Sequence, residues 1–395
     1  MSNATEPEVS TDGTFDATRL VAYPGAIAFA FLAAQMVLLL LPADLRAEQG
    51  VRIGGDWPAF YAAAETVWTG KLNALYDWGT QRELQAPFVL EEERHALIPF
   101  PYPPVVAIWL SPLTVLGYTG SYLVSVAGSL VAVAIAITRL GEQLGRVRHF
   151  RAAALASALA FAPLVRAIYG GQNTAITLLV ITVIAVAPTS WGAMVALGLL
   201  WAKPQFAVWL AVVLVLRGHW KTVLASCLIP AIATVGTAVL WGGAWWEAWL
   251  DALARFQHAD QGYDVGRGLT PYQVIGDVLG PTETLVVALL LGGAVVTWTM
   301  VVARRVSTLD AVVLMTAAMP FALPHMGFYD GGLMVLPMLW LAAALGRRAL
   351  WPSVAMGALL LPACFADPPV PGVLLAVQTV VWLVVAASIR ARRRR

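Results

Sequence analysis

A few polar residues stand out in an otherwise apolar chain because their side chains are of the types that carry chemistry. Asp56 follows two glycines directly after the first long hydrophobic stretch. Lys203 stands in a turn between two short apolar runs, and His325, Tyr329 and Asp330 interrupt two later runs. A carboxylate can act as a base, a ligand or a helix cap, whereas a lysine or a histidine can hold an anion.

The composition indicates where these residues must work. Of 395 residues, 59% are hydrophobic and 12% are charged, against roughly 25% charged in soluble domains. A soluble protein could not bury so much apolar surface, so the sequence predicts an integral membrane protein. The 16 tryptophans and 10 tyrosines suit a chain anchored at two membrane interfaces. The net charge of +2 gives no indication of a nucleic-acid partner.

Histidine and cysteine are too scattered for a metal site. The chain has five histidines and two cysteines, with neither H-x-x-x-H nor C-x-x-C spacing. A metal site built from these residues requires such clusters. We therefore predict no bound metal, and no sequence feature calls for another cofactor.

Hydrophobic runs predict an all-α polytopic membrane protein with about twelve spans. Residues 104–117 are also apolar, but the prolines within and just before them predict a broken or re-entrant segment instead of a crossing. The twelve predicted spans are 20–41, 119–140, 152–168, 173–188, 191–201, 206–216, 222–241, 284–303, 309–324, 331–345, 349–365 and 371–389.

The distribution of charge predicts the orientation. With the N-terminus inside, 16 of the 25 Lys and Arg residues fall on the cytoplasmic side, as the positive-inside rule requires. Both termini are then cytoplasmic: a disordered tail, 1–19, and a basic tail, 391–395, that contacts membrane lipid. Residues 20–390 form one transmembrane domain. Its large outer loops are 43–103, which contains an interfacial amphipathic helix, and 242–272.

Two of the predicted spans are too short to cross. Runs 191–201 and 206–216 are about 16 Å long at 1.5 Å per residue, against about 30 Å of hydrocarbon. The turn between them, which contains Lys203 and Gln205, would lie at membrane depth. A lysine there needs a phosphate or another anion, and the alternative is an ion pair with an acid of the outer face.

Other candidates also allow a structural interpretation. Asp56 could simply cap a helix. Arg166 precedes two glycines and then Gln172 and Asn173 at a helix start, a setting that suits an anion, although an arginine extending to the interface is equally compatible. Tyr102, in a stiff Phe-Pro-Tyr-Pro-Pro turn, is mainly structural but could contact a substrate.

Six short motifs together resemble one known family. They are GGDWPAFY, LYDW, PFPYPP, GGQNTAI, WAKPQF and a late His-x-x-x-Tyr. In this order they resemble glycosyltransferase family 87, over residues from about 20 to 390. These enzymes are polyprenyl-phosphate-sugar-dependent transferases of the GT-C superfamily and include bacterial mannosyltransferases.

The resemblance implies a GT-C-like helical bundle in the bacterial inner membrane, with its active site facing the periplasm. It implies a polyprenyl-phosphate hexose donor, typically mannose, and a lipid or glycan acceptor. The catalytic base falls on Asp56, and the donor phosphate contacts fall on Lys203, Arg166 and His325. The predicted substrate contacts are Tyr102, Gln172, Asn173, Gln205, Tyr329 and Asp330.

The residues fit this chemistry. A sugar phosphate already has a good leaving group, so one carboxylate suffices to deprotonate the acceptor, whereas ordinary glycoside hydrolysis uses two. Cations stabilise the departing phosphate. A single displacement inverts the anomeric configuration.

Two other classes of protein remain open from the sequence. A lipid or sugar transporter, or a flippase, would also be polytopic with charges in the membrane, but it should expose functional polar groups on both faces. Here the polar loops lie on one side, and we find no repeated halves. A non-catalytic scaffold of envelope assembly would tolerate loss of Asp56.

Overall fold

The computed structural model describes residues 25, 26, 30, 54–89, 97–263, 268–276, 278–345 and 370–393. Within them the chain is helical, apart from one isolated bridge between Gly268 and Gly327. The α-helices are α3 (Trp57–Trp68), α4 (Trp78–Gln85), α5 (Pro104–Leu110), α6 (Gly117–Gln143), α7 (Gly145–His149), α8 (Arg151–Leu159), α9 (Ala162–Tyr169), α10 (Thr174–Val186), α11 (Trp191–Leu200), α12 (Pro204–Leu216), α13 (Trp220–Ser226), α14 (Leu228–Trp241), α15 (Ala244–Tyr263), α16 (Pro271–Ile275), α17 (Pro281–Ala303), α18 (Thr308–Ala322), α19 (Val335–Leu345) and α21 (Val370–Arg393). Short 3-10 helices are η1 (Leu72–Ala74), η2 (Ala86–Phe88), η4 (Ser111–Leu116) and η5 (Phe328–Met334).

Several of these helices are long and apolar enough to cross a membrane. Among the described residues there are five, or up to six if α8 and α9 form one bent span. The five are Pro104–Gln143, Trp220–Trp241, Pro281–Ala303, Phe328–Leu345 and Gly372–Arg392. Most of the predicted span 20–41 and all of 349–365 lie outside the described residues, as do residues 1–19.

Two predicted spans differ from the straight helices expected. Span 152–168 is bent by 67° between α8 and α9, where Pro163 lies in the first turn of α9 and cannot donate a helical hydrogen bond. Span 222–241 is divided at Cys227 into α13 and α14. Segment 104–117, predicted to be broken or re-entrant, is divided into α5 and the 3-10 helix η4, and Gly117 with φ of +68° separates η4 from α6. Together with α6 it forms one apolar stretch long enough to cross a membrane.

The short pair of apolar helices is confirmed. Helices α11 and α12 have 10 and 13 residues, so they are only about 15 and 20 Å long. Pro204 occupies the first turn of α12, where its missing N–H is tolerated. Lys203 is the residue before this turn, and only 5% of it is exposed.

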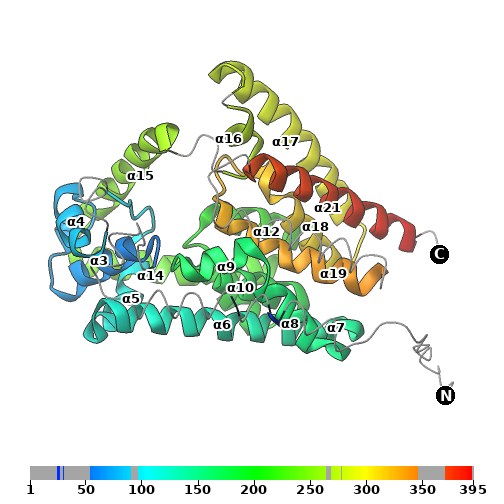
Figure 1. Cartoon of the computed structure of the whole chain (residues 1–395), viewed down its shortest axis with the longest axis horizontal. Helices are drawn as coiled ribbons and strands as arrows, with labels where there is room; N and C mark the ends of the chain where they lie inside the picture. Colours follow the sequence, from blue (N-terminus) through cyan, green and yellow to red (C-terminus); the bar gives the residue numbers. More distant parts are fainter. Residues whose placement is uncertain are drawn as a thin grey trace.

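Helix α6 runs along the length of the molecule, with α3, α4 and α5 at one end and α17, α19 and α21 towards the other (Figure 1). Two hydrophobic clusters follow this division. The larger one is aliphatic and joins α6, α10, α12 and α18, among others. The smaller one, which we call the aromatic cluster, contains Trp57, Phe60, Tyr61, Tyr76, Phe100, Tyr102 and Tyr122.

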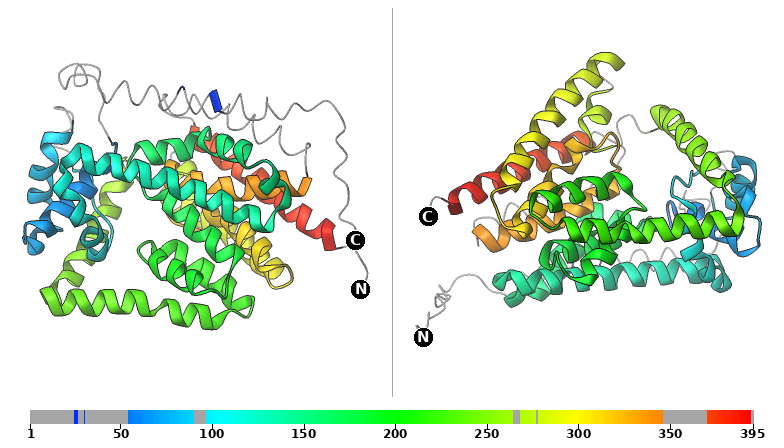
Figure 2. Two further views of the ribbon diagram at one scale, coloured as in Figure 1. Left: turned by 90° about the horizontal axis from the view of Figure 1, so that it is seen from below. Right: turned by 180° about the vertical axis from the view of Figure 1, so that it is seen from behind.

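Helix α3 belongs to the aromatic cluster and does not have the single buried face expected of an interfacial helix. Nine of its 12 residues are buried, including Trp57, Phe60 and Tyr61. Helix α15, in the predicted outer loop 242–272, lies beside α3 and α4 (Figure 2). Its Trp249 Nε1 donates to the carbonyl of Pro101 at 3.2 Å, so this helix helps to cover the aromatic cluster.

Large apolar side chains are exposed on helices that face away from both clusters. On α14, for example, Ile232 and Val239 are 69% and 78% exposed. Contiguous exposed apolar surface of this kind would be unstable in water and is expected to face lipid.

Candidate active site

Asp56 is held against the turn between α9 and α10 by its backbone. Its N–H donates to the carbonyl of Gly170 at 3.0 Å. Gly55 precedes it with φ of +50°, and a Cβ there would lie 2.8 Å from the Cα of Gly170. Only glycine allows so close an approach with this backbone conformation, which explains the glycine before the acid.

The side chain of Asp56 does not act as a helix cap. Asp56 occupies the position before α3, but its carboxylate makes no capping hydrogen bond. Instead, Gln172 Nε2 donates to Asp56 Oδ2. The capping alternative is therefore wrong for this conformation, and the carboxylate points towards the start of α10.

The turn that receives Asp56 is itself fixed. Gly171 has φ of +68°, and the N–H of Gln172 donates to the carbonyl of Ala167 at 2.8 Å. The Tyr122 hydroxyl of α6 donates to the carbonyl of Tyr169 at 2.9 Å. This turn therefore has a single backbone arrangement in which Gln172 meets Asp56.

Lys203 and Asp330 form a buried ion pair. Lys203 Nζ lies 3.0 Å from Asp330 Oδ1, and Thr174 Oγ1 donates to the same oxygen at 3.1 Å. Asp330 comes from η5, which packs closely on α9. A Cβ added at Gly332 of η5 would lie only 3.0 Å from the Cα of Leu164. The alternative in which Lys203 pairs with an acid is thus the one that the structure shows.

Tyr102 links the Asp56 side of the site to the Lys203–Asp330 pair. Its side chain is buried and interacts with Lys203 and Asn173, and the charges of Asp330 and Asp56 also act on it. Burial raises the pKa of the Tyr102 hydroxyl, which therefore stays protonated at neutral pH. The charges of Asp56 and Lys203, far apart in sequence, thus act on the same tyrosine.

Two acceptor oxygens in this cluster are buried with no partner in the part of the chain that the structure describes. They are Gln172 Oε1 and Asn173 Oδ1. An unpaired buried acceptor costs about 1–3 kcal/mol, so native proteins seldom keep one without a reason.

The other predicted site residues are not brought into this cluster by the contacts seen here. Arg166 is exposed at the end of α9, as the interfacial alternative predicts. His325 Nδ1 lies 2.8 Å from Gln273 Nε2 of α16, and its ring packs edge-on against Phe256 of α15. Gln205 and Tyr329 are half-buried.

Sequence reasoning missed several residues that position the cluster. Thr174, which donates to Asp330, was available in the sequence only as part of the GGQNTAI motif. Tyr76 holds the turn before α5, because its hydroxyl donates to the carbonyl of Tyr102 at 2.8 Å. The LYDW motif contains Tyr76 and was the one available indication.

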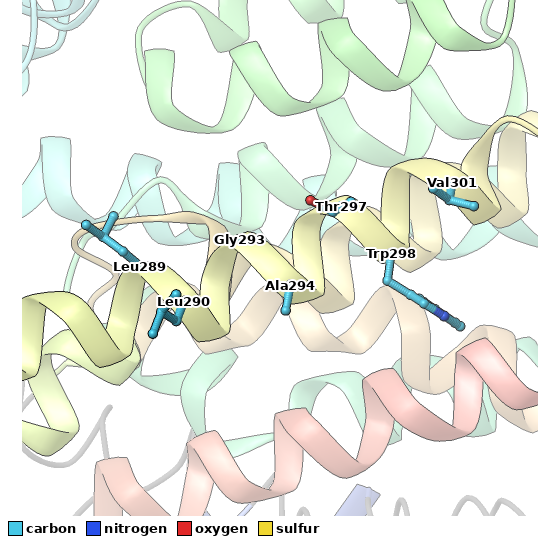
Figure 3. A pocket seen from close by; sticks show the side chains of 7 residues that line it. All are labelled: Leu289, Leu290, Gly293, Ala294, Thr297, Trp298 and Val301. Atoms are coloured by element: carbon cyan, nitrogen blue, oxygen red, sulfur yellow. The ribbon is translucent and has the colours of Figure 1, made fainter.

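A separate groove of about 520 Å³ lies along α17 (Figure 3). Small residues such as Gly293 and Ala294 leave a hollow between Leu290 and Trp298. None of its seven lining residues is ionisable, so this groove suits an apolar chain and not group-transfer chemistry.

The apolar helices and the buried polar cluster define a membrane protein with a carboxylate, a lysine and a tyrosine in one site. Residues 100–337 match the family model of glycosyltransferase family 87. This stretch covers more than half of the chain, so the protein belongs to glycosyltransferase family 87 and the earlier resemblance is confirmed. Neither curated proteins nor solved structures give a match.

Family membership makes the protein a glycosyltransferase with a sugar donor and an acceptor. The matched stretch contains Tyr102, Gln172, Lys203 and Asp330, whereas Asp56 precedes it. The contact from Gln172 to Asp56 therefore connects the matched stretch to the predicted base.

Proposed function

We propose that the protein is an inverting hexosyltransferase that moves a hexose, typically mannose, from a polyprenyl-phosphate carrier to a lipid or glycan acceptor. The observation that carries this proposal is that the start of α10 contacts Asp56 through Gln172 and the Lys203–Asp330 pair through Thr174. Displacement of a lipid phosphate by a hydroxyl needs a base for the hydroxyl and a cation for the phosphate.

In the proposed reaction, Asp56 takes the proton of the acceptor hydroxyl while its oxygen attacks the anomeric carbon. The bond from that carbon to the phosphate oxygen breaks, and the lipid phosphate leaves with the electron pair. Lys203 stabilises the charge that develops on the phosphate. Because one displacement occurs, a β-linked donor gives an α-linked product.

The ion pair with Asp330 is compatible with this role for Lys203. A lysine ammonium has three N–H donors, and Asp330 accepts one of them. Tyr102 interacts with a second, which leaves one N–H for a phosphate oxygen. Arg166 and His325 remain predicted phosphate contacts, and Gln205 and Tyr329 remain predicted substrate contacts.

We further propose a GT-C-like bundle of about twelve spans with both termini in the cytoplasm and the site facing the periplasm. The charge bias along the chain and the exposed apolar faces of α14 and α17 support this arrangement. The donor's polyprenyl chain would then reach the site from within the bilayer.

The decisive experiment measures transfer from polyprenyl-phosphate mannose by purified Asp56→Asn. We expect the rate to fall about 10²–10⁴-fold, the usual contribution of a general base. Asp77→Asn is the matched control, because Asp77 is an exposed acid of the same outer region and asparagine also caps helices. Transfer by Asp56→Asn at near wild-type rate would exclude Asp56 as the base.

A further inference from the structure

Gln172 presents two different groups to the site. Its Nε2 donates to Asp56 Oδ2, and since a carboxylate only accepts, this contact determines which way the amide points. Its Oε1 is therefore directed elsewhere, and it has no partner among the described residues. Gln172 is only 5% exposed, so bulk water does not readily satisfy this oxygen.

Asn173 repeats the same situation in the next position. Its Oδ1 is also buried without a partner in the described part of the chain. Its side chain interacts with the hydroxyl of Tyr102, the residue between Asp56 and Lys203. Two adjacent carbonyl oxygens beside the predicted base thus lack hydrogen-bond donors. Hydroxyl groups are the donors that a sugar would supply.

We propose that Gln172 is a positioning residue for Asp56 and that the amide oxygens of Gln172 and Asn173 form a subsite for hydroxyl groups of a sugar. This inference rests on the proposed glycosyl transfer. The N–H of Gln172 stabilises the charged carboxylate and fixes one of its oxygens, so that the base is ionised and oriented before the acceptor arrives.

The proposal predicts an effect of Gln172 on the pH dependence of transfer. Loss of the N–H donor raises the pH at which Asp56 ionises, so the acidic limb of kcat/KM moves to higher pH. Tyr102 is a titratable group on which the charge of Asp56 acts, and Lys203 and Asp330 act on the same tyrosine. All three are unchanged in variants of Gln172.

The first experiment compares the pH profiles of purified Gln172→Leu and Gln172→Glu. Both should move the acidic limb upwards, and Glu should do so more, because it adds a like charge beside Asp56 and retains the size of the side chain. Gln81→Leu should leave the limb in place, since the Gln81 amide donates to Thr66 of α3. An unchanged limb in both Gln172 variants would overturn the positioning role.

The second experiment measures the Kd of polyprenyl-phosphate mannose and of bare polyprenyl phosphate. We expect Gln172→Leu and Asn173→Leu each to weaken binding of the mannosyl lipid about tenfold and to leave binding of the bare lipid unchanged. Gln81→Leu is the matched control. Gln81 is likewise buried, donates through Nε2 to Thr66 at 2.9 Å and has an Oε1 without a partner among the described residues, but it lies on α4 and its amide bonds to α3.

The outcomes separate donor from acceptor. If the Kd of the mannosyl lipid rises, the hydroxyls belong to the donor. If only the KM of the acceptor rises, with an alkyl mannoside as the probe, they belong to the acceptor. No change in either constant would overturn the subsite while leaving the transferase proposal intact. A wild-type protein that binds neither lipid would overturn both.

Discussion

The Lys203–Asp330 pair gives a quantitative prediction about the removal of one charge. The two side chains are 6% and 8% exposed, and Nζ and Oδ1 are 3.0 Å apart. At an effective dielectric constant of about 20, two unit charges at that distance attract by about 5–6 kcal/mol. Leaving one charge buried without the other costs about 3–5 kcal/mol. We therefore expect the free energy of unfolding to fall by about 3–5 kcal/mol in Asp330→Asn and in Lys203→Met.

The double variant Lys203→Met/Asp330→Asn tests the reasoning. It removes both buried charges, so we expect it to be more stable than either single variant. The assay is equilibrium unfolding in mixed micelles, followed by tryptophan fluorescence. If the double variant loses the sum of the two single losses, the charges are not coupled and the argument fails.

A solvent-exposed pair supplies the control. Arg139 and Glu142 lie 3.1 Å apart at the end of α6, with side chains 55% and 46% exposed. Solvent screens such a pair, so Glu142→Gln should cost less than about 1 kcal/mol. The double variant also separates stability from chemistry: a folded protein that no longer transfers sugar would show that the Lys203–Asp330 pair acts in the reaction and not only in the fold.

Two further predictions concern the first predicted outer loop, residues 43–103. Gly55→Ala should reduce both stability and transfer, because its Cβ would meet the backbone of Gly170. Gly70 has φ of +73° but open space around it, so Gly70→Ala should affect stability alone. Transfer rates and unfolding midpoints of the two variants check this prediction. Asp77→Ala should lose about 1 kcal/mol at pH 7 because it removes the cap of α4. Hydrogen bonds from Thr80, first from its N–H, lower the pKa of Asp77, so its stabilisation is present above the usual aspartate pKa and is lost as the pH falls through the lowered value. The difference between wild type and Asp77→Ala should therefore shrink between pH 7 and pH 2.

Much of the helical layout could be predicted from hydrophobic runs. The expected helix 119–140 is the central part of α6, and 173–188 corresponds to α10. The short runs around Lys203 were also correct in length, because a turn with proline ends one helix and begins the next. The bend between α8 and α9 was not predicted, since Pro163 is compatible with either a helix start or a kink.

The site residues were easier to name than their contacts. Asp56, Gln172, Lys203 and Asp330 were all candidates by residue type and position. Gln172 donates to Asp56, 116 positions away, and Asp330 is the partner of Lys203. Both contacts depend on how the helices pack. A single sequence does not contain that information. Glycines such as Gly55 indicated a close approach, but not to which segment.

The spanning helices also differ in whether their own apolar composition is enough for insertion into a bilayer. Only 22% of the apolar stretch of α17 is buried within the protein, so most of its surface can contact lipid. We therefore expect this helix to insert into the membrane without help from other helices during synthesis. The segment Phe328–Leu345 is 61% buried and begins with the carboxylate of Asp330. Its insertion is costly until Lys203, synthesised earlier, is available to receive it. The ion pair thus sets an order of assembly, in which the polar cluster is completed only when the later helices reach the membrane.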